Sequence, residues 1–443
     1  MRALLINPWI YDFSAFDLWA KPLGLLKIAG CLRKLDVEVH LVDCLDRFHP
    51  QLYAFLKNKL PRTTEFGSGN YYTEIVEKPP VYADIPRRYK RYGLPKELVK
   101  NMIERIPRPE IILVTSGLTY WYPGVIESIR LLKNHFPDVP VILGGIYARL
   151  CFSHAQKNSG ADIVYGGNDI YEIFEIINKL TNKNLDVSKI TTDDVFLYGY
   201  QLYPRLRYIC LRTSAGCPFR CNYCGWYLLE EKFSREDPQL VVKLIEYFYS
   251  HRQIRDFSFY DEALLYQAED HLGKILEGLI KRNIRANLHT PNGLNVKFIT
   301  YPLAVLMKKA GVIQPRLGVE TVAGNENYIH SKTNTNDFLK AFEILKKAGY
   351  HQSEIGINIM IGLPGSTIED VEKSIDFAGS LGGRIFLEEY SPVPGTKSYQ
   401  ESGLSIDVDP LMHNNTAYLY FRYKNYENVQ KLKDKVHKLN SRL

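Results

Sequence analysis

Alternation of short apolar runs with amphipathic segments over residues 2–180 constrains the fold of this chain most strongly. Apolar runs bounded by polar turns predict strands at 3–7, 37–42, 111–115, 139–143 and 161–165. Apolar residues at helical spacing predict helices at 23–35, 124–136 and 170–180. Repetition of this length produces an α/β fold with a doubly wound parallel sheet, whose ligands bind beyond the carboxyl ends of the strands.

Residues 206–400 repeat the strand–helix alternation six times. The predicted strands lie at 208–211, 257–260, 285–290, 314–319, 355–361 and 384–388. Six units are too few to close the usual eight-stranded barrel. We therefore predict a domain at 1–185, a polar linker at 186–205, a second domain at 206–400 and a C-terminal helical extension at 401–443.

The first domain contains an insertion at 49–109 that differs in composition from its surroundings. Because long loops inside a compact domain are usually functional, we interpret the insertion as a lid over a ligand pocket. Basic and aromatic residues interleave at 86–93. Such interleaving can bind single-stranded nucleic acid, but we favour the alternative of packed tyrosines beside solvated charges.

Composition limits the classes of protein that this chain can represent. Of 443 residues, 45% are hydrophobic and 24% are charged, as in an ordinary globular protein. No apolar run approaches ~20 residues, so we expect no membrane span. A net charge of +7 spread over the chain does not by itself indicate nucleic acid. Seven cysteines, three of them clustered, indicate a reducing compartment, and we expect a cytoplasmic protein.

The clustered cysteines carry the strongest chemical signal. Cys217, Cys221 and Cys224 are spaced CxxxCxxC and follow an apolar run at 208–211. Three thiolates at this spacing fit a cubane iron–sulfur cluster in which one iron has no protein ligand. The alternatives are a zinc site, which usually has a fourth Cys or His, and unrelated structural thiols.

This motif and its context resemble the radical S-adenosylmethionine (SAM) superfamily. The resemblance implies a partial (β/α)6 barrel, a [4Fe-4S] cluster on the three cysteines, and SAM bound to the open iron. It places Tyr223 near the adenine, Asp261 or Glu262 at the SAM ammonium group, Glu320 at a hydrogen bond to SAM, and Gly362 beside the adenine. Two glycines of the family's ammonium-binding motif are missing, which leaves open which acid makes that contact.

Glu320 has an alternative interpretation. In that alternative it is a buried carboxylate satisfied by Arg316 or by another base at a strand end. Cys210 and the cysteines outside the motif are expected to be structural.

Two short motifs in the first domain resemble those of cobalamin-binding domains. Ser116-Gly117-Leu118 follows the third strand and Gly144-Gly145 follows the fourth. The family's histidine-bearing motif is absent after the first strand, which implies cobalamin bound without a protein imidazole. The alternative is a relic fold without the cofactor. The nearby aromatic residues have two interpretations of their own: a cover over one face of a corrin, or the interface with the next domain. The implied cobalamin contacts are Asn7, Trp9, Ser116, Leu118, Tyr120, Gly144, Gly145 and Gly166.

The combined resemblance implies a radical SAM enzyme, most simply a cobalamin-dependent methyltransferase acting on an unactivated carbon. The alternatives are a radical SAM cyclase or rearrangement enzyme, a cobalamin-free relative, and a non-catalytic protein that binds SAM. Implied partners are a small-molecule or peptide substrate and an electron donor such as flavodoxin or ferredoxin, without nucleic acid or membrane. The sequence assigns no catalytic residue of the chain itself.

Overall fold

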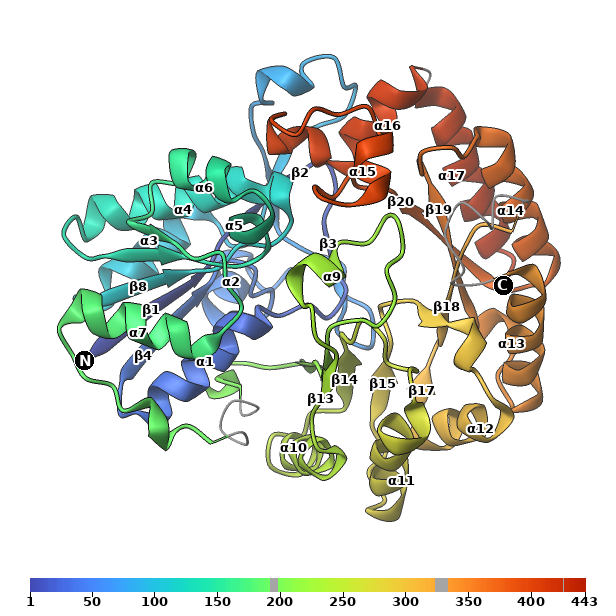
Figure 1. Cartoon of the computed structure of the whole chain (residues 1–443), viewed down its shortest axis with the longest axis horizontal. Coiled ribbons are helices and arrows are strands. Elements are labelled where there is room, and N and C mark those ends of the chain that lie inside the picture. The colour runs from blue at the N-terminus through green and yellow to red at the C-terminus, as the bar shows by residue number, and fades with distance from the viewer. Residues whose placement is uncertain (192–197, 323–333, 425) are drawn as a thin grey trace. The chain divides into compact units, whose positions relative to one another are not determined.

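A computed structural model describes residues 1–191, 198–322, 334–424 and 426–443, and the chain divides into two compact units (Figure 1). The first unit is Met1–Arg207 together with Asp409–Met412; the second is Tyr208–Val408 together with His413–Leu443. The predicted linker at 186–205 therefore belongs to the first unit, and its residues 192–197 lie outside the described residues. No helix in the described ranges has the length and apolarity needed to cross a membrane.

The sheet of the first unit has five parallel strands in the order β10-β9-β8-β1-β4. This confirms the predicted doubly wound α/β fold. Because the order reverses between β1 and β8, the loops after these two strands diverge and create the usual ligand position of such sheets. The strands are β1 (Arg2–Asn7), β4 (Glu38–Asp43), β8 (Ile111–Val114), β9 (Val141–Leu143) and β10 (Ile163–Val164).

Helices cover both faces of this sheet (Figure 1). Successive strand side chains point to opposite faces, so Leu4 and Ile6 join one core, whereas Ala3 and Leu5 join the other. Helices α3 (Lys96–Glu104) and α4 (Tyr122–His135) pack on the first face, and α1 (Leu23–Lys34) and α7 (Ile170–Thr181) on the second. The shorter helices of the unit are α2 (Pro50–Phe55), α5 (Ile146–Leu150) and α6 (Phe152–Asn158).

The insertion folds against the segment that follows β1. Strand β7 pairs with β2 and β6, and β3 pairs with β5. Tyr89 is buried and packs edge-on against Phe13 and Tyr82, so its ring is not available for stacking on a base. The lid function stays a prediction. These strands are β2 (Ile10–Asp12), β3 (Phe16–Asp17), β5 (Gly69–Asn70), β6 (Thr73–Ile75) and β7 (Lys90–Tyr92).

The second unit contains all six predicted strands, arranged in two parallel sheets ordered β11-β14-β15-β17 and β16-β18-β19-β20. Pro291 and Pro315 interrupt the chain between β15 and β16 and between β17 and β18, because proline cannot donate a ladder hydrogen bond. The strands are β11 (Tyr208–Leu211), β14 (Asp256–Phe259), β15 (Asn287–His289), β16 (Leu294–Asn295), β17 (Val312–Ile313), β18 (Arg316–Glu320), β19 (Gly356–Ile361) and β20 (Arg384–Glu389).

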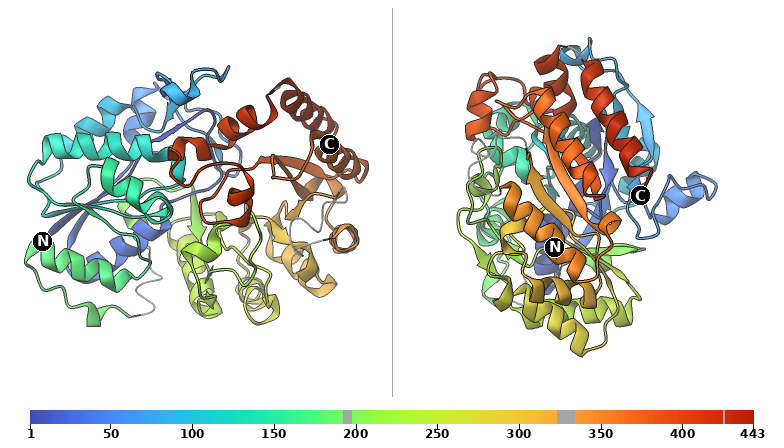
Figure 2. Two further views of the ribbon diagram at one scale, coloured as in Figure 1. Left: turned by 45° about the horizontal axis from the view of Figure 1, so that its top comes forward. Right: turned by 90° about the vertical axis from the view of Figure 1, so that its right-hand side faces the viewer.

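Helices follow the strands, and the C-terminal segment covers the free edge of the second sheet. The amide of Asn440 donates to the carbonyl of Ile385 and accepts from its N–H, at 2.8 and 2.9 Å. Helix α17 therefore protects edge strand β20 from further pairing (Figure 2). The helices are α9 (Trp226–Leu229), α10 (Pro238–His251), α11 (Leu272–Lys281), α12 (Tyr301–Ala310), α13 (Thr335–Lys347), α14 (Ile368–Ser380), α15 (Lys397–Glu401), α16 (Asn415–Tyr423) and α17 (Tyr426–Asn440).

Candidate active site

The three clustered cysteines lie on one loop closed by a short antiparallel pair. Strands β12 (Ser214–Ala215) and β13 (Ser234–Arg235) pair at its base. Gly216 has φ +78°, and a side chain there would lie 2.5 Å from the carbonyl of Lys232, so only glycine fits. Cys221 is buried, while Cys217 and Cys224 are partly exposed, and all three are free thiols. The loop thus holds its thiols without a disulfide.

Across the described parts of the chain, no three His, Cys, Asp or Glu side chains gather closely enough to hold a single metal ion.

Asp261 ties down the segment that leads into the cysteine loop. Its Oδ1 accepts from the Thr213 N–H at 3.0 Å, the Thr213 hydroxyl at 2.9 Å and the Ser214 hydroxyl at 2.6 Å. The carboxyl group is 2% exposed, and burial raises its pKa. Its other oxygen, Oδ2, is buried without a hydrogen-bond partner. One oxygen is therefore structural, and the other can accept a donor that the protein does not supply.

Glu262 forms an ion pair that motif spacing did not predict. Its carboxylate pairs with Arg212, whose Nε lies 3.1 Å from Oε1, and its side chain is almost fully buried. Arg212 in turn lies over the ring of Trp226. Burial raises the pKa of Glu262 to about 7 despite this partner. Glu262 Oε1 is also buried without a hydrogen-bond partner, so the prediction that Asp261 or Glu262 binds a ligand ammonium group stays open, with Arg212 beside Glu262 favouring Asp261.

Tyr223 and Glu320 meet although 97 residues separate them. The Tyr223 hydroxyl donates to Glu320 Oε1 at 2.5 Å. Glu320 has φ +62°, and the pairing of β18 with β19 shifts register between Gly318 and Glu320. Non-glycine residues rarely adopt this backbone conformation, and such strain concentrates at functional sites. The geometry thus joins the aromatic of the cysteine motif to the strand-end carboxylate.

Arg316 does not neutralise Glu320. Its guanidinium stacks on the ring of Phe386, 3.9 Å from the centroid, and it forms no ion pair with any described residue. Arg316 is therefore not the base that satisfies Glu320, and the part of the alternative that names another strand-end base stays open.

Gly362 is buried beneath the C-terminal helices rather than open to a ligand. A side chain at this position would collide with Leu419 of α16, and its φ is +95°. Arg422 of α16 donates to the carbonyls of Leu363 at 3.2 Å and Ser366 at 3.4 Å. The predicted contact of Gly362 with a cofactor is corrected to a packing role. No pattern in the sequence linked helix 415–423 to this loop.

In the first unit, Ser116 and the glycine pair lie together after β8 and β9. The Ser116 hydroxyl donates to the Gly144 carbonyl at 2.6 Å and accepts from the Ala148 N–H at 3.3 Å. Gly145 has φ +93°, and a side chain there would collide with the Ser116 backbone. A side chain at Gly144 would meet no atom within 4 Å. Of these two glycines, only Gly144 therefore borders open space.

Two of the predicted aromatic contacts belong to the core instead. Trp9 is 1% exposed, and its indole N–H donates to the Leu94 carbonyl at 2.7 Å. Tyr120 is 4% exposed and packs edge-on against Trp121. Because neither ring has an open face, both predictions of a ligand contact are corrected. Leu118, by contrast, is 37% exposed, and Gly166 is also exposed.

Asn7 belongs to a polar cluster at the end of β4 that sequence reasoning missed. Its amide donates to Asp43 Oδ1 at 2.6 Å, and the Tyr203 hydroxyl donates to Asp43 Oδ2 at 2.6 Å. Lys21 Nζ lies 3.8 Å from Asp43 and 3.9 Å from Asp46, and all three side chains are buried. Burial raises the pKa of Asp46 to about 6. Lys21 and Tyr203 lie in segments with no recognisable motif.

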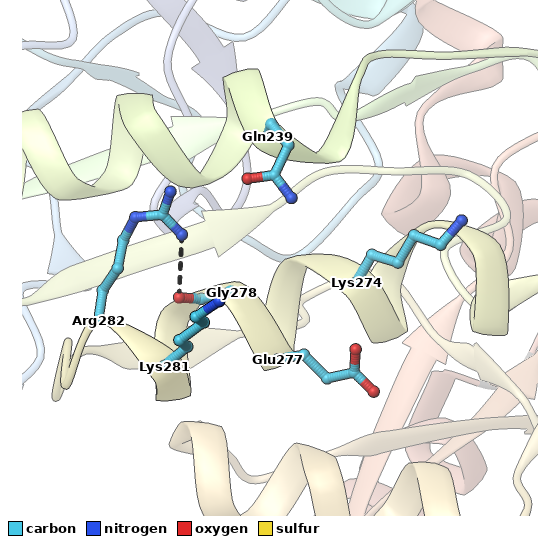
Figure 3. Close-up of a pocket in the computed structure, with 6 residues that line it drawn as sticks. All are labelled: Gln239, Lys274, Glu277, Gly278, Lys281 and Arg282. Atoms are coloured by element: carbon cyan, nitrogen blue, oxygen red, sulfur yellow. Dashed lines mark hydrogen bonds between the residues drawn. The ribbon is translucent and has the colours of Figure 1, made fainter.

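A separate groove lies on the helical layer of the second unit (Figure 3). None of the candidate residues lines it, and its charged side chains are those of solvated helix surfaces. Arg282 reaches the Gly278 carbonyl at 3.3 Å and pairs with Glu246. The lining residues are Gln239, Lys274, Glu277, Gly278, Lys281 and Arg282.

Comparison with known families bears on the second unit. Residues 211–378 match the family model of the radical SAM superfamily. The chain carries a radical SAM domain. The matched range includes the cysteine loop, Asp261 and Glu320. The cofactors of such a domain are SAM and a [4Fe-4S] cluster.

Solved structures of the radical SAM methyltransferase TsrM from Kitasatospora setae share the fold of both units. One, with tryptophan substrate and the SAM analogue aza-SAM, has a TM-score of 0.62 at 14% identity and covers 90% of this chain and 75% of TsrM. Another, with cobalamin and a [4Fe-4S] cluster, has a TM-score of 0.59. This likeness shows the predicted order of a doubly wound sheet followed by a radical SAM barrel.

Curated relatives are distant and differ in activity. An anaerobic magnesium-protoporphyrin IX monomethyl ester cyclase from Synechocystis is 21% identical over 284 residues, or 56% of each chain. A tRNA-2-methylthio-N(6)-dimethylallyladenosine synthase from Finegoldia magna is 23% identical over 62% of each chain. An uncharacterized methyltransferase from Pyrococcus horikoshii is 22% identical over 70% of this chain and 73% of its own length. The chain spans 56% and 62% of the first two relatives.

Proposed function

We propose that this radical SAM enzyme is a cobalamin-dependent methyltransferase that acts on an unactivated carbon. The main support is that one chain contains both a radical SAM cysteine loop and a doubly wound sheet with open space at Gly144. The likeness in fold to TsrM, whose structure contains cobalamin and a [4Fe-4S] cluster, supports the same proposal.

The residues of the second unit fit the cofactors of a radical SAM domain. Cys217, Cys221 and Cys224 would hold the cluster, which when reduced supplies the electron that cleaves SAM to methionine and a 5′-deoxyadenosyl radical. The orphaned Oδ2 of Asp261 fits a cationic donor such as the SAM ammonium group, because a carboxylate is the strongest neutral-pH acceptor for it. Tyr223 and Glu320, fixed by their mutual hydrogen bond, would orient SAM above the barrel.

The carboxyl ends of the strands in the first sheet fit the nucleotide tail of cobalamin at one position. Gly144 borders open space. Leu118, two residues after Ser116, is exposed and would supply an apolar contact to the tail. Ser116 would act by holding the two loops together through its bonds to Gly144 and Ala148. Asn7, fixed by Asp43, would present its backbone after β1. Cobalamin bound here would supply the methyl group that is transferred.

We also propose a small-molecule or peptide substrate, an electron donor such as flavodoxin or ferredoxin, and a reducing cytoplasmic location. All seven cysteines are free thiols, which supports the last point. A rival function is a radical SAM cyclase or rearrangement enzyme, and the distant relative named as a cyclase favours it.

Product analysis of the anaerobically reconstituted protein tests the proposal. A methyltransferase is expected to retain corrin and, under reducing conditions, to form S-adenosylhomocysteine as well as 5′-deoxyadenosine. A cyclase or rearrangement enzyme forms only 5′-deoxyadenosine, and a non-catalytic protein forms neither. Formation of 5′-deoxyadenosine without any S-adenosylhomocysteine, in protein loaded with corrin, would exclude methyl transfer.

A further inference from the structure

One face of the sheet β16-β18-β19-β20 carries polar side chains that the chain itself leaves unmatched. Strand side chains alternate, and Ile357 and Ile359 are fully buried on one face. Met360 lies on the other face and packs with the apolar cluster that also contacts Tyr223. We call this second surface the inner face. By alternation and register, its members include Arg316, Gly356, Asn358, Met360, Phe386 and Glu388.

Arg316 is held in place on the inner face by stacking and not by charge. It is 7% exposed and lies over Phe386, which belongs to a strand two positions away. Gly356 of the intervening strand makes this reach possible, since a side chain there would lie 2.9 Å from Arg316 Cγ and 3.0 Å from Phe386 Cε2. No described residue forms a hydrogen bond or ion pair with the guanidinium. Its N–H donors are therefore available.

Glu388 supplies the opposite charge on the same face. Its side chain is exposed to solvent, and desolvation by the surrounding protein raises its pKa. The Arg316 charge opposes this rise in the pKa of Glu388, and burial lowers the pKa of Arg316. Each charge thus affects the pKa of the other group, but the two side chains form no ion pair. Asn358, on the strand between them, has a buried Oδ1 without a hydrogen-bond partner.

A purely structural pair would be arranged differently. Buried opposite charges are tolerated when they are in contact and hydrogen-bonded, because an uncompensated buried charge costs several kcal/mol. Here the buried Arg316 guanidinium stacks on Phe386 without an ion pair, Glu388 on the same face is exposed, and Asn358 Oδ1 on the strand between them is unmatched. Such an arrangement is complementary to a ligand that carries both charges.

We infer that Arg316 and Glu388 bind the carboxylate and the ammonium group of a zwitterionic substrate of the α-amino acid class. Asn358 would hydrogen-bond between the two groups, and Phe386 and Met360 would contact apolar parts of the ligand. This inference rests on the proposed function and names the substrate class of that enzyme.

Calorimetric titration of the holoenzyme with three matched probes tests the inference. The probes are L-phenylalanine, L-phenylalaninamide, which lacks the carboxylate, and N-acetyl-L-phenylalanine, which lacks the cation. Wild-type protein is expected to bind L-phenylalanine saturably and each derivative roughly 10- to 150-fold more weakly, the value of a charge-assisted hydrogen bond. Arg316→Gln should abolish discrimination between the acid and the amide, and Glu388→Gln that between the amine and its N-acetyl form.

A matched control separates this effect from a general loss of arginine. Arg255 also stacks on an aromatic ring, that of Tyr249 at 4.0 Å, but it is exposed. Arg255→Gln should leave all three affinities unchanged. If Arg316→Gln does not fold, Arg316→Lys keeps the charge, loses the planar fork and should weaken only the two carboxylate probes.

Two outcomes overturn the inference: no saturable binding of L-phenylalanine to wild type, or unchanged discrimination in both variants. Binding of the N-acetyl form as tightly as the free amino acid also overturns it, since the ligand would then be a simple anion. Reductive SAM cleavage without substrate reports separately on the proposed function. Cleavage should persist in Arg255→Gln, and its absence in wild type would contradict the proposed function instead.

Discussion

Two strand-end aspartates, Asp43 in the first unit and Asp261 in the second, hold neighbouring loops in the same way but differ in charge balance. Asp43 accepts from Asn7 and Tyr203 through both oxygens, and the buried Lys21 lies 3.8 Å away. Asp261 accepts three hydrogen bonds through one oxygen, forms no ion pair with any residue that the structure describes, and leaves its second oxygen buried and unmatched.

This difference in charge balance distinguishes a structural cluster, which has no further hydrogen-bonding capacity, from a site that can accept a ligand. A buried carboxylate with its own cation and donors on both oxygens has no further capacity. A buried oxygen without a partner costs about 1–3 kcal/mol, which a bound cation can offset. We therefore expect changes at Asp43 to affect folding and changes at Asp261 to affect ligand binding.

Substitution of the cluster cysteines should produce the largest effect. Cys217→Ala, Cys221→Ala or Cys224→Ala removes one of three thiolates and is expected to abolish reductive SAM cleavage, while the fold survives. Iron content and 5′-deoxyadenosine yield measure the effect. Cys44→Ala is the matched control, because Cys44 is buried directly after β4 in the first unit. Persistent cleavage in any of the three variants would contradict the assignment of the cluster to this loop.

Asp43→Asn should reduce stability most among the remaining changes. It deprives Lys21 of a nearby carboxylate, and breaking one side of a buried charge cluster costs roughly 3–5 kcal/mol. The denaturant midpoint of the variant measures the loss. Asp261→Asn should leave this midpoint unchanged or higher, because it removes a buried charge whose pKa is already raised. Equal losses of stability in the two variants would remove the distinction between the two aspartates.

Glu262 should make stability fall as pH rises. Its folded-state pKa of about 7 exceeds its ordinary value of 4.5, so the folded state holds a proton that the unfolded state loses in this window. Stability is then highest below pH 4.5 and decreases by roughly 3 kcal/mol through pH 7. Denaturant midpoints at several pH values in wild type and Glu262→Gln measure the difference. Identical pH slopes in the two proteins would show that Glu262 is not the titrating group.

Asp261→Asn should weaken SAM binding roughly 10- to 100-fold while the cluster absorbance stays. The charge on the orphaned oxygen would be lost, but the hydrogen bonds to Thr213 and Ser214 through Oδ1 can remain. Glu262→Gln is the control and should leave SAM affinity unchanged, since Arg212 occupies that carboxylate. The reverse pattern, with only Glu262→Gln impaired, would exchange the roles of the two acids.

The sequence predicted the fold well because periodicity records which face of a strand or helix is buried. All predicted strands of both units were found, and the doubly wound order followed from strand–helix alternation. The predicted strand at 314–319 was too long at its start: β18 begins at Arg316, because Pro315 cannot donate a ladder hydrogen bond.

The candidate site was harder to predict, because side-chain partners depend on distant parts of the chain. Trp9 and Tyr120 followed strands, as ligand contacts do, but the core enclosed them. Glu262 was predicted as a ligand contact, but motif spacing did not predict its ion pair with Arg212 from a neighbouring strand end. The inner-face pair, Arg316 and Glu388, came together only through the register of three strands. Motif spacing shows which residue types are present. It does not show which polar groups already have hydrogen-bond partners within the protein.

The smallest expected effect concerns Gly144 and Gly145, the adjacent glycines of the first unit. A side chain at Gly144 would enter open space, so Gly144→Val should fold, whereas Gly145→Val combines φ +93° with a collision against Ser116 and should lose stability. If a nucleotide tail occupies the space at Gly144, the valine overfills it at a cost of about 1–3 kcal/mol, or roughly 5- to 150-fold in corrin affinity.

Corrin retention after gel filtration measures the effect on Gly144→Val, with circular dichroism and iron content as controls for folding and cluster assembly. The variant should lose corrin, keep its cluster and still cleave SAM, because the cysteine loop and Asp261 lie in the other unit. Corrin bound equally by wild type and Gly144→Val would place the cofactor elsewhere. Wild-type protein that retains no corrin after reconstitution with hydroxocobalamin would contradict cobalamin binding altogether, and the radical SAM domain would then act without it.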